Sequence, residues 1–437
     1  MRTLDWQTLD EAARTAALAR PQAALSESVA AQARAIIDRV RNEGDAALLD
    51  YARQFDDVVL TSLRVPEEEF TAARGSLRSA QLQAIQTAIA NVTAFHRAQL
   101  PEALSIETQP GVLCERLIRP IQSVGLYVPA GSAPLPSTVV MLAVPARIAG
   151  CPQRVLCTPA QRDGRANAAV LVAAQLCGID TVFKIGGAQA IAAMAYGTGS
   201  VPKVSKIFGP GNAWVTAAKQ QVAADPEGAA LDLPAGPSEV LVIADDSARA
   251  AFVAADLLAQ AEHDPSSQAI LLTTSPVLAQ QVADEIRTRI PQLSRRAILE
   301  RSLGAIRLIV VPTLEVALQI SDRYAPEHLL IETREPRVLL DRVNNAGSVF
   351  LGHWTPESMG DYCSGTNHVL PTYGYARAYS GLSVPDFVRR MTVQQLSEEG
   401  LRALGPVAAT LANLEGLDAH ASAVDLRLQA LAGKGNP

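Results

Sequence analysis

VGLYVPAGSAPLPSTVVMLAVPARIAGCPQRVLCT, residues 124–158, contains two short apolar runs on either side of a helical stretch. Val124 to Pro129 predicts a strand, and Arg154 to Thr158 predicts the next one. Between them, Ser137 is expected to cap a helix that continues through Ala149. Near-continuous apolar strands joined by helices are typical of a parallel sheet that is covered on both faces.

The same alternation continues to residue 351 and predicts two successive α/β units, 124–237 and 239–351. The further strands are expected at 181–185, 204–208, 239–243, 268–273, 307–311, 328–331 and 348–351. The further helices are expected at 168–177, 188–196, 213–224, 248–263, 277–290, 314–324 and 335–345.

The flanking segments have a different character. Residues 26–104 are helical in pattern and are expected to pack on the second α/β unit, whereas 108–119 predicts a small β element. Residues 381–437 also have a helical pattern, with helices expected at 385–391, 393–396, 398–414 and 419–432. Because this tail is too short for a core of its own, we expect it to dock on another surface.

The composition limits the classes of protein to which the chain can belong. With 437 residues, 48% hydrophobic and 19% charged, the chain is expected to form a globular protein of two or more domains. The formal charge of −6 provides no field that would attract nucleic acid or an anionic membrane. The N-terminus has no apolar signal-peptide region, and the longest apolar run, 139–150, is shorter than the ~20 residues of a membrane span. Five cysteines without a Cys-x-x-Cys pair favour reduced thiols and a cytoplasmic location.

Three loops of the first unit contain glycine where a strand is expected to end: Pro129-Ala130-Gly131, Gly186-Gly187-Ala188-Gln189 and Gly209-Pro210-Gly211-Asn212. Ligands of parallel sheets bind at the carboxyl ends of strands, and glycine lets the backbone approach a phosphate closely. Any one of these loops is equally well explained as a tight turn, and none matches G-x-G-x-x-G. Three in one unit favour a dinucleotide or another phosphate ligand.

Gln260-x-x-His263 ends an apolar helical run just before Pro265 and presents an oxygen donor and an imidazole on one helix face. Most such pairs are ordinary polar helix ends. Asp361, in a loop rich in polar residues, and His420, between the two tail helices, complete a set of two nitrogen and two oxygen donors. Such a set suits zinc or another borderline divalent ion.

Pro326-Glu327-His328 places a carboxylate beside an imidazole where a helix is expected to join a strand. Such a pair suits proton transfer, because imidazole titrates near neutrality and the carboxylate can activate water. In isolation, a surface glutamate beside a half-buried histidine would be the simpler explanation. By contrast, no histidine or lysine lies near Cys114, Cys151 or Cys157 in the sequence to activate them, so we interpret these thiols as structural.

Several segments in combination resemble the histidinol dehydrogenase family over essentially the whole chain. They are YVPAGSAPLPSTVVMLAVPA, IGGAQAIAAMAYGT, FGPGNAWVTAAK, DLPAGPSEVLVIAD, QAEHDPSSQAILLT, YAPEHLLIE, GSVFLGHWTPESMGDYCSGTNHVLPTYGYA, DFVRRMTVQQL and EGLDAHASAV. The resemblance implies two incomplete Rossmann-like parallel α/β domains, a small β-containing segment and a helical C-terminal tail.

The resemblance also implies domain boundaries. The first domain, on the NAD side, would combine 1–22, 127–237 and 372–380; the second, on the metal side, would combine 24–104 and 239–371. Residues 105–126 would connect them, and 381–437 would dock on the partner subunit of a homodimer.

Residue roles follow from the same resemblance. It implies zinc bound by Gln260, His263, Asp361 and His420, acid–base catalysis by Glu327 and His328, and NAD contacts from Tyr127, Gln189 and Asn212. Besides the metal ligands and His328, substrate contacts would come from Ser238, His368 and Glu415, with Glu415 and His420 supplied by the partner.

The implied reaction is the last step of histidine biosynthesis, in which L-histidinol is oxidised to L-histidine through L-histidinal and two NAD+ are reduced. His328 would be the general base and Glu327 would activate water. Three alternatives remain: a dehydrogenase of the same scaffold acting on another small alcohol, a metal-dependent hydrolase, and a non-catalytic binding protein. The glycine loops argue against the hydrolase, and the Glu327-His328 pair argues against the non-catalytic binding protein.

Overall fold

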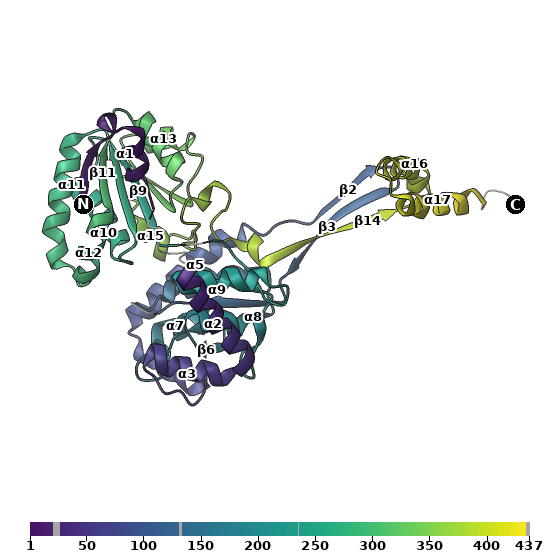
Figure 1. The fold of residues 1–437 in the computed structure, drawn as a ribbon, viewed down its shortest axis with the longest axis horizontal. Helices are drawn as coiled ribbons and strands as arrows, with labels where there is room; N and C mark the ends of the chain where they lie inside the picture. Colours follow the sequence, from purple (N-terminus) through teal and green to yellow (C-terminus); the bar gives the residue numbers. More distant parts are fainter. Residues whose placement is uncertain (21–26, 131–132, 235, 434–437) are drawn as a thin grey trace. The chain divides into compact units, whose positions relative to one another are not determined.

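The computed structural model describes residues 1–20, 27–130, 133–234 and 236–433. They divide into two compact units (Figure 1). The first unit comprises Met1–Gln99 with Ile121–Phe387, and the second comprises Leu100–Pro120 with Val388–Pro437. The first unit contains two parallel sheets, one of five strands and one of six, which we call the five-stranded half and the six-stranded half.

The five-stranded sheet forms from the first predicted α/β unit and confirms its parallel character. All of its strand pairs are parallel, in the order β6-β5-β4-β7-β8. The strands are β4 (Ser123–Tyr127), β5 (Gln153–Thr158), β6 (Val182–Lys184), β7 (Lys206–Phe208) and β8 (Ala230–Leu231). The helices between them are α6 (Pro136–Ala149), α7 (Ala168–Leu176), α8 (Gly187–Tyr196) and α9 (Ala213–Ala224).

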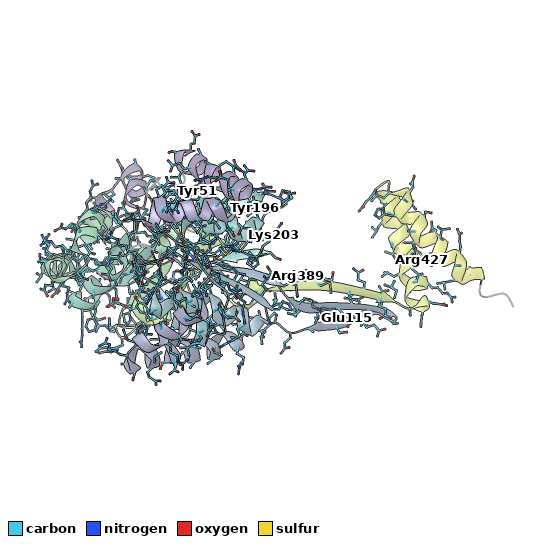
Figure 2. The ribbon with its side chains drawn as sticks, turned by 90° about the horizontal axis from the view of Figure 1, so that it is seen from below. Tyr51, Glu115, Tyr196, Lys203, Arg389 and Arg427 are labelled. Carbon is cyan, nitrogen blue, oxygen red and sulfur yellow. The ribbon has the colours of Figure 1, made fainter. Side chains whose placement is uncertain are left out.

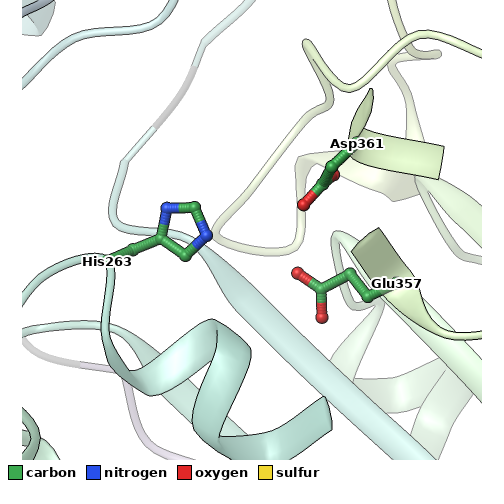
Figure 3. Close-up of side chains that lie close together, drawn as sticks. All are labelled: His263, Glu357 and Asp361. Carbon is green, nitrogen blue, oxygen red and sulfur yellow. The ribbon is translucent and has the colours of Figure 1, made fainter. Parts of the chain in front are cut away.

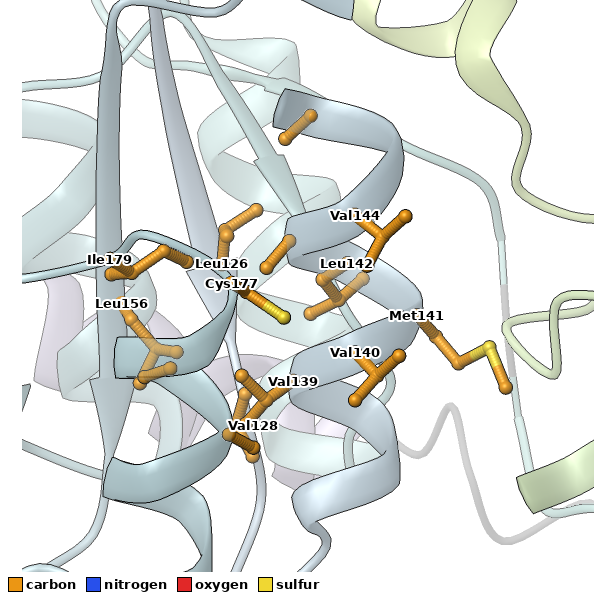
Figure 4. Close-up of a cluster of buried hydrophobic side chains, with 14 of the residues drawn as sticks. Leu126, Val128, Val139, Val140, Met141, Leu142, Val144, Leu156, Cys177 and Ile179 are labelled. Carbon is orange, nitrogen blue, oxygen red and sulfur yellow. The ribbon is translucent and has the colours of Figure 1, made fainter. Parts of the chain in front are cut away.

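Helix α6 packs on one face of this sheet through its apolar side chains. It begins at Pro136, whose fixed φ suits a first helical position, and ends at Gly150 with φ +81°. The expected cap Ser137 instead lies inside the helix, and Leu135 takes the cap position. Its apolar side chains are buried against β4, β5 and α7 (Figure 4). Although α6 is strongly apolar, no helix in the described part of the chain is long and apolar enough to cross a membrane.

The six-stranded sheet forms from the second predicted α/β unit, again with parallel pairs throughout, in the order β1-β11-β10-β9-β12-β13. The strands are β1 (Arg2–Asp5), β9 (Glu239–Ala244), β10 (Gln268–Thr273), β11 (Ile306–Val310), β12 (His328–Glu332) and β13 (Ser348–Leu351). The helices are α10 (Ala250–Ala261), α11 (Pro276–Arg289), α12 (Arg296–Ser302), α13 (Leu314–Tyr324), α14 (Pro336–Leu340) and α15 (Glu357–Tyr362).

The N-terminal segment corrects the expected domain boundaries. Residues 1–22 were assigned to the NAD-side domain, but β1 pairs with β11, Arg2 opposite Arg307, and so completes the six-stranded sheet. The short 3-10 helix η1 (Trp6–Thr8) and helix α1 (Glu11–Ala17) follow, and Trp6 packs into the core beneath that sheet. The physical reason is the open edge of β11, which offers unpaired backbone groups to a parallel strand. Residues 21 and 22 of this segment lie outside the described residues.

The expected placement of the helical segment 24–104 is also corrected, because its residues 27–99 cover the five-stranded half rather than the six-stranded one. Residues 24–26 lie outside the described residues. The segment forms α2 (Glu27–Glu43), α3 (Asp45–Asp56), α4 (Glu67–Ser76) and α5 (Ser79–Arg97). Ile37 and Leu48 share a core with Phe183, and Phe70 shares another with α6 and α7. Helical periodicity identifies an apolar face but not the surface that the face covers.

Residues 372–380 were also expected with the NAD-side domain. In the structure, the Tyr373 N–H donates to the Glu239 carboxylate at 3.0 Å, and Arg377 donates to the Arg323 carbonyl, so this segment packs on the six-stranded half. It includes the 3-10 turn η5 (Tyr375–Arg377).

The second unit consists of an antiparallel sheet and two helices (Figure 2, where Glu115, Arg389 and Arg427 mark its elements). The sheet has the order β14-β3-β2, built from β2 (Leu104–Gln109), β3 (Val112–Pro120) and β14 (Val388–Leu396). The predicted β element at 108–119 is confirmed, but the helices expected at 385–391 and 393–396 are wrong. That segment forms a short 3-10 turn, η6 (Val384–Phe387), and then β14, because pairing with β3 satisfies its backbone. Helices α16 (Glu398–Leu414) and α17 (Asp418–Gly433) follow as predicted.

Candidate active site

Glu327 and His328 lie at the start of β12, and both are buried. They follow Ala325, a non-glycine residue with φ +53° that ends α13. The Glu239 N–H donates to Glu327 Oε2 at 2.8 Å, and the Glu239 carbonyl oxygen lies 3.1 Å from His328 Nδ1. One residue of the neighbouring strand β9 therefore holds both side chains.

The contact with Glu239 also fixes the tautomer of His328. A carbonyl oxygen can only accept, so Nδ1 must carry a proton and donate it. In the neutral imidazole, Nε2 is then the basic nitrogen. Nε2 is buried, has no hydrogen-bond partner among the described residues, and lies 3.5 Å from Asp361 Oδ1. The arrangement leaves a proton acceptor open beside Asp361.

Carboxylates surround this imidazole. Glu327 Oε2 and Glu357 Oε1 each lie 3.6 Å from Nδ1. Burial disfavours the imidazolium, but the charges of Glu357 and Glu327 outweigh it and raise the pKa of His328 well above its usual value. Burial raises the pKa of Glu327 to about 8 and also raises that of Glu357. These shifts favour the protonated forms of all three groups, so His328 and Glu327 are stronger bases than the same groups in water.

A group of possible metal ligands lies next to this pair. His263, Glu357 and Asp361 each offer one ligand atom, and these atoms lie within 4.8 Å of one another (Figure 3). Glu357 and Asp361 lie four residues apart on α15 and so share a face. His263 lies beyond the last helical residue, Ala261, in a turn closed by its N–H to the Gln260 carbonyl at 3.2 Å. The helix expected at 248–263 therefore ends earlier, and a turn rather than a helix presents His263.

Gln260 is fully buried, yet neither Oε1 nor Nε2 of its carboxamide has a partner among the described side chains and backbone. A buried unpaired amide costs about 1–3 kcal/mol, so native proteins retain one where a ligand satisfies it. The imidazole of His263, the carboxylate of Asp361 and this amide oxygen form a donor set that suits a borderline divalent ion. These residues fit a bound zinc.

Two further predicted substrate residues lie in the first unit. His368 Nδ1 donates to the Asp361 carbonyl at 2.7 Å, and its Nε2 accepts from Thr138 Oγ1 at 3.2 Å. His368 thus connects α6 of the five-stranded half to the backbone of Asp361. Ser238 directly precedes Glu239, and its carbonyl accepts from the Gln268 N–H at 3.1 Å.

The predicted cofactor residues lie at the carboxyl ends of the five-stranded sheet. The Tyr127 hydroxyl accepts from the Gly187 N–H at 3.0 Å, Gln189 is buried in α8, and Asn212 caps α9 through Val215 N at 3.1 Å. Their side chains shape the loops after β6 and β7. Gly131 of the first loop lies outside the described residues.

The turn after β7 requires glycine. Gly209 has φ +125°, and a Cβ there would lie 2.1 Å from the Tyr127 carbonyl oxygen. A buried ion pair fastens the same turn: Asp232 accepts from the Gly209 N–H at 2.8 Å, while Lys219 pairs with Asp232 and donates to the Gly209 carbonyl at 2.9 Å. The backbone here is held close to the end of β4.

The remaining two predicted site residues, Glu415 and His420, belong to the second unit. Both are exposed, Glu415 as the C-cap of α16 and His420 in the first turn of α17. Their predicted contacts with metal and substrate stay predictions.

Sequence reasoning missed Glu357 and Glu239. Glu357 lies one residue before the polar loop that was singled out, and its spacing of four from Asp361 was the available signal. Glu239 acts through its backbone, which leaves no signature in side-chain chemistry. Cys151 and Cys157 agree with their structural interpretation, since burial raises the pKa of Cys151 to about 11 and also that of Cys157.

A parallel α/β fold, a buried acid–base pair and an adjoining cluster of nitrogen and oxygen donors together define an enzyme rather than a scaffold. The family profile of histidinol dehydrogenase matches residues 19–428. The chain therefore belongs to the histidinol dehydrogenase family.

Individual relatives agree with this assignment. The chain is 54% identical over 431 residues to the histidinol dehydrogenase of Vibrio parahaemolyticus, covering 99% of both proteins. It is 56% identical over 428 residues to that of Xanthomonas euvesicatoria, covering 98% of this chain and 99% of the relative. The crystal structure of histidinol dehydrogenase from Elizabethkingia anophelis matches with a TM-score of 0.93 at 44% identity, over 99% of each chain. The resemblance noted in the sequence is confirmed.

Proposed function

We propose that the chain oxidises L-histidinol to L-histidine through L-histidinal, reducing two NAD+, as the last step of histidine biosynthesis. The observation that carries the proposal is the orientation of His328, with Nδ1 anchored on Glu239 and Nε2 open beside the candidate metal cluster. Membership of the family over nearly the whole chain supports the choice of substrate.

His328 is the general base. Its Nε2 takes the hydroxyl proton of the alcohol while hydride leaves the carbon that bears this hydroxyl, which oxidises the alcohol to an aldehyde. The resulting imidazolium is stabilised by Glu357 and Glu327, whose carboxylates lie 3.6 Å from Nδ1. NAD+, when bound, accepts one hydride in each of the two oxidations.

Glu327 acts in the second half of the reaction. Its carboxylate accepts a proton from water as the water oxygen bonds to the aldehyde carbon, and the carbonyl oxygen takes a proton from the His328 imidazolium formed in the first oxidation, which gives a gem-diol. Loss of a proton and a second hydride from the gem-diol gives the carboxylic acid. The pKa of Glu327, raised by burial to about 8, makes its carboxylate a stronger base than an exposed glutamate. Because the aldehyde is reactive, we expect it to remain bound between the two steps.

The proposed zinc ligands are Gln260, His263, Asp361 and His420. When bound, zinc would hold the amino group and imidazole of the substrate and so fix its orientation. The unpaired amide of Gln260 and the proximity of His263 to Asp361 support the first three ligands. Ser238, His368 and Glu415 are proposed to contact the substrate as well.

Tyr127, Gln189 and Asn212 are proposed to contact NAD. Support comes from their position at the carboxyl ends of parallel strands and, for Asn212, at the N-terminus of α9. A cytoplasmic location is proposed from the biosynthetic role and from the five free cysteines among the described residues.

Counting NADH tests the four-electron reaction. A limiting amount of histidinol with excess NAD+ is expected to give two NADH per histidinol and to leave histidine as the product. The alternative, a dehydrogenase of another small alcohol, predicts no NADH from histidinol. One NADH per histidinol, with histidinal released, would contradict the role of Glu327.

We also propose a homodimer in which α16 and α17 complete the partner's site. The second unit buries mainly Ala409, Ala412 and Ala421 between its two helices. Three large apolar side chains one helical turn apart on α16, Val407, Leu411 and Leu414, are 51%, 55% and 78% exposed. Such an apolar face supports docking on another surface.

Mixing two inactive variants tests the shared site. His328→Ala chains combined with His420→Ala chains give heterodimers in which one of two sites keeps both residues, if His420 acts on the partner. Random pairing makes half of the dimers mixed, so about a quarter of native activity is expected. His328→Ala mixed with Asp361→Ala provides the matched control, since both changes lie in the first unit and no rescue is expected. Absence of rescue in purified His328/His420 heterodimers would contradict a site completed in trans.

A further inference from the structure

We propose that Arg20 is a positioning residue for the catalytic pair, acting on Glu327 and His328 through Glu239 and Tyr324. This inference rests on the proposed function, since it assigns Arg20 to the geometry of that reaction. Arg20 follows α1 in the N-terminal segment, more than 300 residues before the residues it would position.

Every polar group of Glu239 is engaged, and two of them hold the catalytic side chains. The backbone N–H donates to Glu327 Oε2 at 2.8 Å, and the carbonyl accepts from His328 Nδ1 at 3.1 Å. Its carboxylate accepts from the Tyr373 N–H at 3.0 Å and from Arg20. Any rotation of the backbone at Glu239 would therefore move both catalytic contacts at once.

Arg20 fixes Glu239 in two places. Its Nε lies 2.5 Å from Glu239 Oε1 and its Nη2 lies 2.9 Å from Oε2, which is the bidentate arrangement of a guanidinium on a carboxylate. The Glu239 side chain in this pair is 1% exposed and that of Arg20 is 16% exposed. Buried charge-assisted contacts of this kind hold geometry more tightly than a surface ion pair.

The same guanidinium also holds the turn that leads into Glu327. Arg20 Nη2 donates to the Tyr324 carbonyl at 2.7 Å, and its guanidinium carbon lies 3.9 Å from the centre of the Tyr324 ring. Tyr324 is the last residue of α13, followed by Ala325 in the left-handed region with φ +53°. A non-glycine residue in this region is strained and persists only where its surroundings hold it.

Arg20 thus connects the two backbone segments that supply the catalytic contacts, the start of β9 and the turn before β12. Among the described residues its hydrogen bonds and ion pair go to Glu239 and Tyr324 and not to His263, Glu357 or Asp361, so its loss need not disturb metal binding. Small displacements of reacting groups reduce turnover steeply, by up to about 100-fold for 1 Å.

The experiment compares Arg20→Met and Arg20→Lys with Arg14→Met in the full-length enzyme. Arg14 is the matched control, because it too donates to a backbone carbonyl, that of Trp6, and lies over the Trp6 ring, in the same segment. Measurements are kcat, the KM for NAD+, zinc per chain and thermal stability. Arg20→Met is expected to lower kcat about 10- to 100-fold with zinc and the KM for NAD+ unchanged. Arg20→Lys, which keeps the charge but lacks the planar fork, is expected to recover part of that loss. Arg14→Met is expected to keep native kcat.

A folded, zinc-loaded Arg20→Met enzyme with native kcat would overturn the inference, as would an equal loss in Arg14→Met. Failure of both Arg20 variants to fold would also overturn it, because Arg20 would then support the fold rather than the pair. A native chain that reduces no NAD+ with histidinol would instead refute the proposed function. In that case, NMR of a chain isotopically labelled at its six histidines tests the hydrogen bond from His328 Nδ1 to the Glu239 carbonyl, through the resonance of the Nδ1–H proton. This resonance is expected in the native protein and in Arg14→Met, and its persistence in Arg20→Met would overturn the inference.

Discussion

Replacing His328 with alanine is expected to lower kcat by about 10²- to 10⁴-fold, the usual contribution of a positioned general base. His328 Nε2 is the open acceptor of the site, and the imidazole is held in one tautomer by Glu239. Alanine removes the acceptor, and water in the vacated space is a weaker base without fixed orientation. Zinc content is expected to remain native, because His328 lies beside Asp361 without belonging to the group of metal ligands.

The measurement pairs steady-state turnover with metal analysis on the same preparation. His353→Ala is a suitable control, because His353 follows the end of β13 and lies 3.7 Å from a buried carboxylate, Glu332, but contacts neither catalytic residue. It is expected to keep native turnover. Loss of zinc from His328→Ala would contradict the assignment of His328 as a base, and near-native kcat would contradict its role altogether.

Replacing His263 with alanine is expected to abolish metal binding and activity together. His263 supplies the imidazole of the cluster, and without it the remaining members, Glu357 and Asp361, offer only oxygen donors, which zinc binds less well. Even the loss of a residue that hydrogen-bonds a metal ligand typically reduces metal affinity 10- to 100-fold, so loss of a ligand itself should reduce it further. Zinc per chain after dialysis and turnover with histidinol are the two quantities to compare.

Glu262→Ala is the control for His263→Ala, because Glu262 occupies the same turn after α10 and is outside the donor cluster. It is expected to retain zinc and turnover. A His263→Ala enzyme that remains fully zinc-loaded and active would show that the metal, if bound, lies elsewhere.

The local sequence pattern was sufficient to predict the two parallel sheets. Runs such as Val124 to Val128 and Val240 to Ile243 are almost entirely apolar and end at glycine or polar loops, as in strands buried on both faces. What local pattern could not specify was pairing over long distances. The four residues of β1 are mostly exposed and alternate weakly, and nothing in them identifies β11 as their partner.

The prediction of helices for the segment that forms β14 was wrong for a related reason. Only two of the nine residues from Val388 to Leu396 are partly buried and the rest are exposed, so no apolar stripe distinguished a strand from a helix. Its antiparallel partner β3 decides the conformation, and β3 lies almost 270 residues earlier in the chain. Strand propensity depends on such partners more than helix propensity does.

The sequence pattern singled out several side chains of the candidate site, but neither Glu357 nor the residues that hold the catalytic pair in place. Gln260, His263 and Asp361 stand out because polar donors at the ends of apolar segments are unusual. Glu239 begins an apolar strand, and its importance lies in its N–H and carbonyl, which every residue has. Arg20 has no sequence neighbour that points to the catalytic pair.

The parallel pairing of β1 with β11 also sets an order of events during synthesis. The five-stranded sheet has all of its strands once residue 231 has left the ribosome, and α2 to α5, which cover it, precede it in the chain. Strand β1, by contrast, cannot pair with β11 until residue 310 has been made. At roughly 5–20 residues per second, β1 waits for about 15–60 s without its neighbour. The half that holds the catalytic pair is therefore completed after the five-stranded half, although its strand β1 is synthesised before every strand of that half.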